Sequence, residues 1–162
     1  MLAGASTWLA SWGSDQWQYP PPVDVIDRDL KRGALYVVTR NDNGEVVASA
    51  TIDTHADPDF WVSEDHPDDA LYIHKMAVDR RWSGRRLGGA LLDFAAELAE
   101  ERERSWVRLD AWKTNPELHR YYTSQGFTLL RIVDLLHRQS GALFQRDAKV
   151  RRSGVSLRRQ SP

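Results

Sequence analysis

The stretch Val78 to Leu92, VDRRWSGRRLGGALL, constrains the fold more than any other part of the chain. It follows Leu71 to Val78, an aromatic and β-branched run of strand length, and it leads without a linker into apolar residues spaced like one face of a helix. Between the two lies a turn with Gly84, Gly88 and Gly89, which let a ligand approach the backbone closely. The sequence therefore predicts a strand, a glycine-rich turn and an amphipathic helix in direct succession.

The charge of this turn points to an anion. The first turn of a helix has N–H groups without partners inside the helix, and the helix dipole places positive charge there. Arg85 and Arg86 would be repelled at this position by roughly 0.3–1 kcal/mol each, so a bound anion explains them better than their position alone. Phosphate is an anion that helix N-termini bind. A solvated turn whose arginines only keep the chain soluble is the alternative.

The same stretch resembles the pyrophosphate-binding motif of the GNAT acetyltransferases: a strand, a turn of the form R/Q-G-x-G-x-G, and a helix with paired leucines. The matching residues are Gly84, Leu87, Gly88, Leu91 and Leu92. Ser83 stands where the family has Arg or Gln, and Arg86 stands where it has its middle glycine. The resemblance implies that the turn binds the pyrophosphate of acetyl-CoA through Gly84, Arg85, Arg86, Leu87, Gly88 and Gly89.

A second segment, Val107 to Phe127, resembles the downstream signature of that family, N-x-x-(apolar)-x-x-x-Y-x-x-x-G-F. It predicts a strand and then a helix capped by Asn115 and ended by Gly126. These two residues have structural explanations, and Tyr122 taken alone could simply fill a core position. The resemblance implies instead that Tyr122 is the general acid for the leaving thiolate, and that Asn115 and Tyr122 contact the cofactor.

The resemblance also implies where the thioester lies. An amine attacks acetyl-CoA directly, and it must first lose a proton because an alkylammonium has a pKa of about 10. The backbone amides of Met76, Ala77 and Val78 are implied to bind the pantetheine and the developing oxyanion.

Two side chains are candidates for the general base. His74 is the first, because imidazole titrates near neutral pH and simple alternation places it on one strand face with Tyr72, Met76 and Val78. Asp110 on the neighbouring strand is the second, provided that burial raises its pKa. A water path could carry the proton instead of either.

The remaining apolar runs predict a mixed α/β (α+β) fold. Leu35 to Arg40 and Val46 to Ile52 flank an Asn-Gly hairpin signal, and a short helix is predicted near Val25 to Lys31. Strands at Phe127 to Leu135 and Ala142 to Gln145 complete the element order of the GNAT fold, a central sheet flanked by helices. The family's first strand has no counterpart ahead of the helix indicated by Trp8, Leu9 and Trp12. Either the start of this chain lies downstream of the natural one, or the sheet edge is open, which would allow a homodimer.

Composition indicates one globular domain, since 41% of the 162 residues are hydrophobic and 28% are charged. We expect the acetyltransferase domain to span residues 1–146. Residues 147–162 form a basic stretch without apolar periodicity, which predicts a disordered tail. A net charge of −1 argues against a protein devoted to nucleic acid, although the tail could contact RNA or DNA.

Other classes of protein are disfavoured by specific absences from the sequence. Without cysteine there is no thiolate nucleophile and no cysteine metal site, and the five histidines lack ligand spacing, so we expect no metal. The first residues have neither a signal-peptide pattern nor a membrane span. We therefore expect a cytoplasmic protein that does not engage a membrane.

The resemblance implies an N-acetyltransferase, and we expect it to transfer the acetyl group of acetyl-CoA to a primary amine of a small molecule. Acetylation of a protein N-terminus, a lysine or an aminoacyl-tRNA is an alternative within the same chemistry. A non-catalytic acyl-CoA-binding module is an alternative of another class. The acceptor pocket is expected in variable loops, here Thr54 to Asp69 and the region of Trp17.

Overall fold

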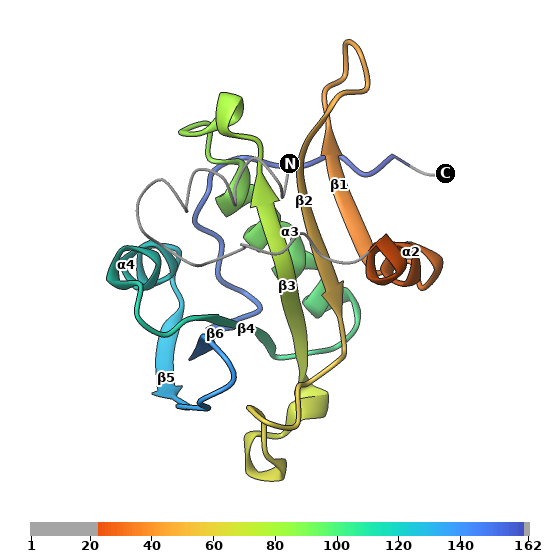
Figure 1. The fold of residues 1–162 in the computed structure, drawn as a ribbon. Coiled ribbons are helices and arrows are strands. Elements are labelled where there is room, and N and C mark those ends of the chain that lie inside the picture. Colours follow the sequence, from red (N-terminus) through yellow and green to blue (C-terminus); the bar gives the residue numbers. More distant parts are fainter. Residues whose placement is uncertain (1–22, 161–162) are drawn as a thin grey trace.

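The structure, a computed structural model, describes residues 23–160 (Figure 1). Its helices and strands are, in chain order, α2 (Val23–Lys31), β1 (Leu35–Thr39), β2 (Val46–Asp53), β3 (Ala70–Val78), α3 (Leu87–Glu101), β4 (Trp106–Trp112), α4 (Pro116–Ser124), β5 (Thr128–Ile132) and β6 (Ser140–Asp147). Short 3₁₀ turns lie at Ser63–Asp65, Pro67–Asp69 and Arg80–Trp82. The expected first helix, the absent first strand and Trp17 fall outside the described residues.

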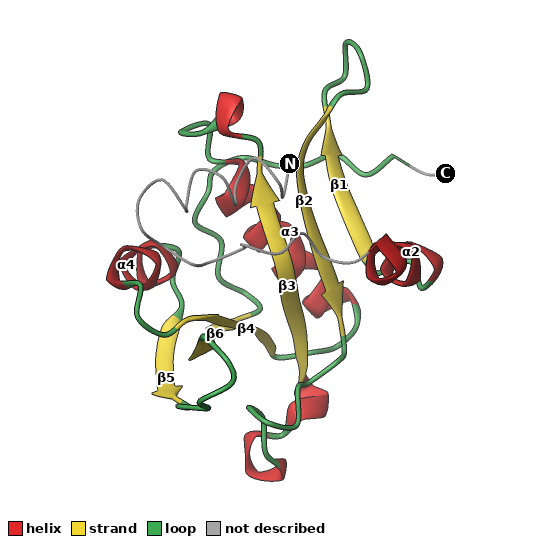
Figure 2. Cartoon of the chain, in the orientation of Figure 1, coloured by secondary structure: helices red, strands yellow, loops and turns green. Residues whose placement is uncertain are grey.

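The six described strands form one mixed sheet in the order β1-β2-β3-β4-β6-β5. Neighbouring strands are antiparallel, except that β3 and β4 run parallel, as a strand–helix–strand crossover through α3 requires. Figure 2 shows α3 behind β3, and α2 beside β1. This mixed sheet with flanking helices confirms the predicted fold class.

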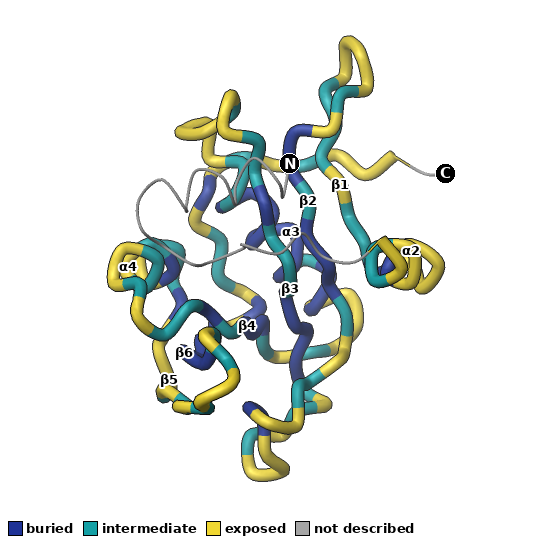
Figure 3. The backbone as a smooth tube through the Cα atoms, viewed as in Figure 1, coloured by how far each residue is buried: buried dark blue, intermediate teal, exposed yellow. Residues whose placement is uncertain are grey.

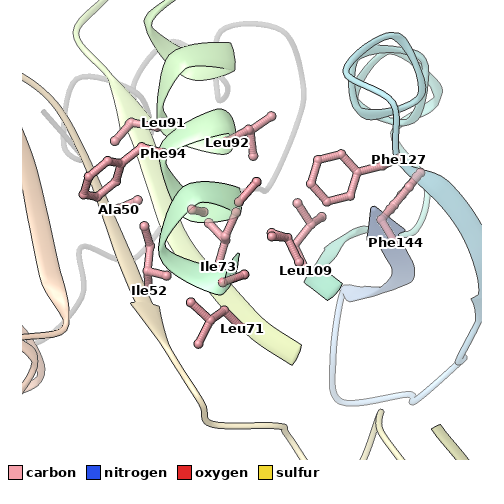
Figure 4. Packing of buried hydrophobic residues seen from close by; sticks show 14 of the residues in the cluster. Ala50, Ile52, Leu71, Ile73, Leu91, Leu92, Phe94, Leu109, Phe127 and Phe144 are labelled. Carbon is pink, nitrogen blue, oxygen red and sulfur yellow. The ribbon is translucent and has the colours of Figure 1, made fainter. Parts of the chain in front are cut away.

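The main core lies between the sheet and α3, which contributes Leu91, Leu92 and Phe94 (Figure 4). Ala50 and Ile52 of β2 face this core. Strands β2, β3 and β6 and helix α3 are largely buried, whereas α2 and β5 expose much of their length (Figure 3). Strand β3, which leads into the glycine turn, is therefore held by packing on both faces of the sheet.

A β-bulge interrupts β3 at Lys75, whose φ is +51°. Ser49 pairs with Ala77 and Thr51 pairs with His74, so two residues of β3 oppose one residue of β2. The extra residue shifts the alternation: Met76 and Val78 pack against the main core, whereas Tyr72 belongs to a second buried cluster. The prediction that His74 shares a face with Met76 and Val78 is therefore wrong. His74 stays with Tyr72, and their rings stack at 6.5 Å.

That second cluster surrounds a buried arginine. Arg108 is 3% exposed, lies 4.9 Å from the ring of Trp61, and donates hydrogen bonds to Gln145 Oε1 at 2.8 Å and to the carbonyl of Asp65 at 2.7 Å. Arg131 holds the same loop by pairing with the Asp65 carboxylate at 2.6 Å. The loop after β2, predicted to be variable, is thus fixed to β4 and β5.

Beyond β6, residues 148–160 form neither helix nor strand, but they follow a defined path along α3 (Figure 1). Ser153 is 4% exposed, and its N–H donates to the carboxylate of Asp93 on α3 at 2.8 Å. Asp93 also pairs with the guanidinium of Arg146, which is 1% exposed, at 3.0 Å. The basic segment for which we predict disorder therefore contacts the main helix specifically.

Candidate functional site

The sheet is split next to the glycine turn. Strands β3 and β4 pair only at Ala70–Trp106, Leu71–Val107 and Tyr72–Arg108, near the start of each strand. Beyond Tyr72 the ladder ends, so the remaining part of β3 has backbone N–H and C=O groups without a strand partner on that side. A ligand with amide groups can hydrogen-bond to such an open edge.

A cleft of about 480 Å³ adjoins the open end of β3 and the start of α3. Eight of the eleven predicted cofactor-binding residues line it, namely Met76, Ala77, Val78, Gly84, Arg86, Leu87, Gly88 and Gly89. Ser83 and Trp82 complete this wall. The structure therefore brings the predicted strand amides and the predicted phosphate turn to one concave surface.

The backbone of the turn explains why the family has glycines there. Gly84 has a φ of +78°, and Arg86, at the N-cap of α3, has a φ of +60° in the left-handed region. A side-chain-bearing residue adopts that conformation at a cost of roughly 1–2 kcal/mol, which glycine avoids. Arg86, which departs from the family pattern, thus adopts a conformation that glycine favours and adds a guanidinium at the cleft.

Gly88 and Gly89 are small because α4 approaches them closely. A Cβ atom on Gly88 would lie 2.5 Å from the hydroxyl of Tyr121, and one on Gly89 would lie 2.7 Å from Oε1 of Gln125. That Gln125 oxygen is buried and has no hydrogen-bond partner among residues 23–160. Both side chains line the cleft, so α4 forms its second wall.

Three predicted cofactor contacts do not line the cleft. The guanidinium of Arg85 stacks over the ring of Trp82 at 4.6 Å. Asn115 caps α4, where its side-chain oxygen accepts from the N–H of Leu118 at 3.0 Å, as the capping prediction requires. Tyr122 points into the core and packs against Phe144 at a ring distance of 5.5 Å.

The two adjacent tyrosines therefore occupy different environments. Tyr122 is 9% exposed, and burial, with smaller contributions from Tyr121 and Asp110, raises its pKa well above the usual value. Tyr121 lines the cleft, and burial raises its pKa too. Both phenols stay protonated at neutral pH, the form that a proton donor needs.

The two base candidates lie outside the cleft wall. His74 Nε2 is 3.3 Å from Oδ1 of Asp53, which also accepts the N–H of His55 at 2.9 Å. Burial raises the pKa of Asp53, but the nearby His74 ring and the hydrogen bond from the N–H of His55 outweigh it, so the pKa of Asp53 falls below its usual value. Asp110 forms no ion pair within the described chain, and its charge acts on Tyr122.

Sequence reasoning missed Tyr121, Gln125, Arg152 and Ser153 as lining residues. For α4 a signal existed: Leu118, Tyr121 and Gln125 recur at helical spacing and so share one face. Arg152 and Ser153 had no such signal in the sequence, because no periodicity marks residues 148–160. Within residues 23–160, no cluster of His, Asp or Glu could hold a metal ion, and no helix is long and apolar enough to cross a membrane.

Known proteins resemble this chain in sequence and in fold. Residues 3–127 match the acetyltransferase (GNAT) family. The protein named uncharacterized N-acetyltransferase YesJ of Bacillus subtilis (strain 168) is 25% identical over 134 residues, which are 80% of this chain and 74% of that protein. A GNAT-family acetyltransferase from Listeria monocytogenes superposes with a TM-score of 0.74 at 24% identity, covering 90% of this chain and 84% of that one.

A third relative is described with its cofactor. The NatC complex bound to Gag peptide and CoA superposes with a TM-score of 0.60 at 14% identity, covering 79% of this chain and 80% of that one. The fold is thus shared with these acetyltransferase structures. The chain belongs to the acetyltransferase (GNAT) family.

Proposed function

We propose that this acetyltransferase transfers the acetyl group of acetyl-CoA to the primary amine of a small molecule, by direct attack within a ternary complex. The observation that carries the proposal is the continuity of the cleft, from the unpaired edge of β3 to the glycine turn of α3. A pantetheine arm offers amides to a strand edge, and a pyrophosphate suits a helix N-terminus. CoA itself is bound by the related NatC complex.

In this proposal, the backbone of Met76 to Val78 holds the thioester. An N–H group aimed at the carbonyl oxygen stabilises the negative charge that develops as the amine attacks. Side-by-side binding of the two substrates removes much of the entropic barrier. As the tetrahedral intermediate collapses, the C–S bond breaks and the thiolate takes a proton from a tyrosine of α4.

Tyr122 is the proton donor that the family pattern favours, and Tyr121 is the donor that the cleft favours. For the acceptor's own proton, Asp110 has better support than His74, because His74 already faces Asp53 at 3.3 Å. A carboxylate without an ion-pair partner within residues 23–160 can receive the acceptor's ammonium and pass its proton to water. A small molecule that carries an ammonium group is therefore the acceptor that we propose.

The experiment combines cofactor binding with turnover. We expect the purified protein to bind acetyl-CoA in calorimetry and to acetylate at least one member of a panel of small primary amines faster than peptides with free N-termini. Gly88→Val should abolish binding, because its side chain would meet the hydroxyl of Tyr121 and fill the cleft.

Gly44→Val is the control, since Gly44 lies outside the cleft, in a hairpin turn with open space around it. Its φ of +71° makes valine strained there, so this variant also controls for a general loss of stability. Unchanged binding by Gly88→Val would move the cofactor site elsewhere. Binding without turnover of any amine would favour the non-catalytic acyl-CoA module, and faster turnover of peptides would replace the small-molecule acceptor.

A further inference from the structure

The C-terminal basic segment supplies one wall of the cleft. Arg152 and Ser153 line it together with the turn at the start of α3. Arg86, at the start of α3, donates from Nη1 to the carbonyl of Ser153 at 3.4 Å. The segment therefore meets the predicted phosphate turn directly.

The anchor of this segment is buried, which makes its position specific. Asp93 is 4% exposed and accepts the N–H of Arg152 at 3.0 Å and the N–H of Ser153 at 2.8 Å. Arg146, whose guanidinium also donates to the carbonyl of Gln125 at 3.0 Å, balances the charge of Asp93. A buried carboxylate with this many donors fixes the backbone of residues 152 and 153.

The arginines of the segment divide into two groups. Arg151 and Arg159 pair with Glu100 and Glu101 at the end of α3, so their charges are used to hold the segment down. Arg152 has no carboxylate partner within the described chain, and neither has Arg86. Two uncompensated guanidinium groups therefore border the same cleft.

We propose that Arg152 and Arg86 together bind the phosphate groups of the CoA nucleotide, so that the C-terminal segment is part of the cofactor site. The inference rests on the proposed function and deepens it. Guanidinium groups pair with phosphate through planar, charge-assisted hydrogen bonds. Asp93 acts as a positioning residue, because it holds the backbone that carries Arg152.

The test measures CoA affinity by calorimetry in the full chain. Arg152→Gln should weaken CoA binding roughly 10-fold and reduce its salt dependence, since a charge-assisted hydrogen bond is lost. Arg158→Gln is the matched control: it removes the same charge from an exposed position of the same segment that does not line the cleft. We expect it to bind CoA as the parent does.

The same two variants are titrated with 3′-dephospho-CoA. If Arg152→Gln no longer weakens binding of this ligand, Arg152 binds the 3′-phosphate of CoA. If it still weakens binding, Arg152 binds the pyrophosphate. Either result supports phosphate binding by Arg152. Parental affinity for CoA in Arg152→Gln would overturn it, as would an equal loss in Arg158→Gln. A parent protein that binds no CoA would instead refute the proposed function, so the two failures are distinguishable.

Discussion

Replacing Asp29 with Asn should destabilise the fold in a manner that depends on pH. Asp29 lies on α2, is 2% exposed, and accepts three hydrogen bonds: from Nζ of Lys75 at 2.7 Å, from Arg32 at 2.6 Å and from Thr51 at 3.0 Å. Lys75 occupies the bulge of β3. The carboxylate of Asp29 therefore joins α2 to the strand that carries the proposed thioester site.

The magnitude follows from its pKa. Burial alone would raise the pKa of Asp29, but the hydrogen bonds from Lys75, Arg32 and Thr51 outweigh it and lower the pKa from 3.8 to about 2. A difference of this size corresponds to about 2 kcal/mol of folding free energy at pH 7. Because the folded-state pKa is the lower one, this stability is complete above pH 4 to 5 and is lost as the pH falls toward 2. Roughly half remains at pH 3.

The assay is urea unfolding of the parent and Asp29→Asn at several pH values between 3 and 7. We expect the variant to be less stable by about 2 kcal/mol at pH 7, and the difference to shrink by about half at pH 3. Asp27→Asn is the control, because Asp27 is an exposed carboxylate on the same helix. A difference between parent and Asp29→Asn that does not change with pH would refute the electrostatic reasoning.

Two further predictions concern α4 and α3. If Tyr122 is the general acid, Tyr122→Phe should lower kcat roughly 10²–10⁴-fold with little change in acetyl-CoA affinity, and Tyr121→Phe should not; steady-state kinetics with the reverse pattern would assign the role to Tyr121. Asp93→Asn should cost roughly 3–5 kcal/mol in chemical unfolding, because it leaves Arg146 buried without a counter-charge. It should also speed amide hydrogen exchange at Ser153, and unchanged protection there would contradict the anchoring role of Asp93.

Much of the fold follows from local patterns. The hairpin of β1 and β2 forms around Asn43-Gly44, and the helix after the glycine turn begins at Leu87, as its apolar spacing indicates. The strand and capped helix of the second motif are equally regular, with Pro116 as the first residue of α4. These elements were predictable because neighbouring residues determine them.

The sequence could not reveal features that depend on distant contacts. Nothing local marks Lys75 as the extra residue of a bulge, because its positive φ is stabilised by pairing with Asp29, 46 positions away. Arg146 directly precedes the basic stretch and is a charged residue, yet it is buried because Asp93 on another element balances its charge. For the same reason, the role of Arg152 at the cleft becomes visible only once the segment is seen against α3.

The short ladder between β3 and β4 has a consequence for how fast the protein is degraded in a cell. With only three residue pairs across it, the sheet consists of two halves that α3 bridges, and a ligand lying in the gap would connect them as a missing strand does. Binding to the folded state alone adds about 2.7 kcal/mol of stability at a concentration 100-fold above Kd. The concentration of co-substrate would then govern the lifetime of the enzyme as well as its rate. Protein without bound acyl-CoA would open between β3 and β4 more often and would be degraded faster than protein with acyl-CoA bound.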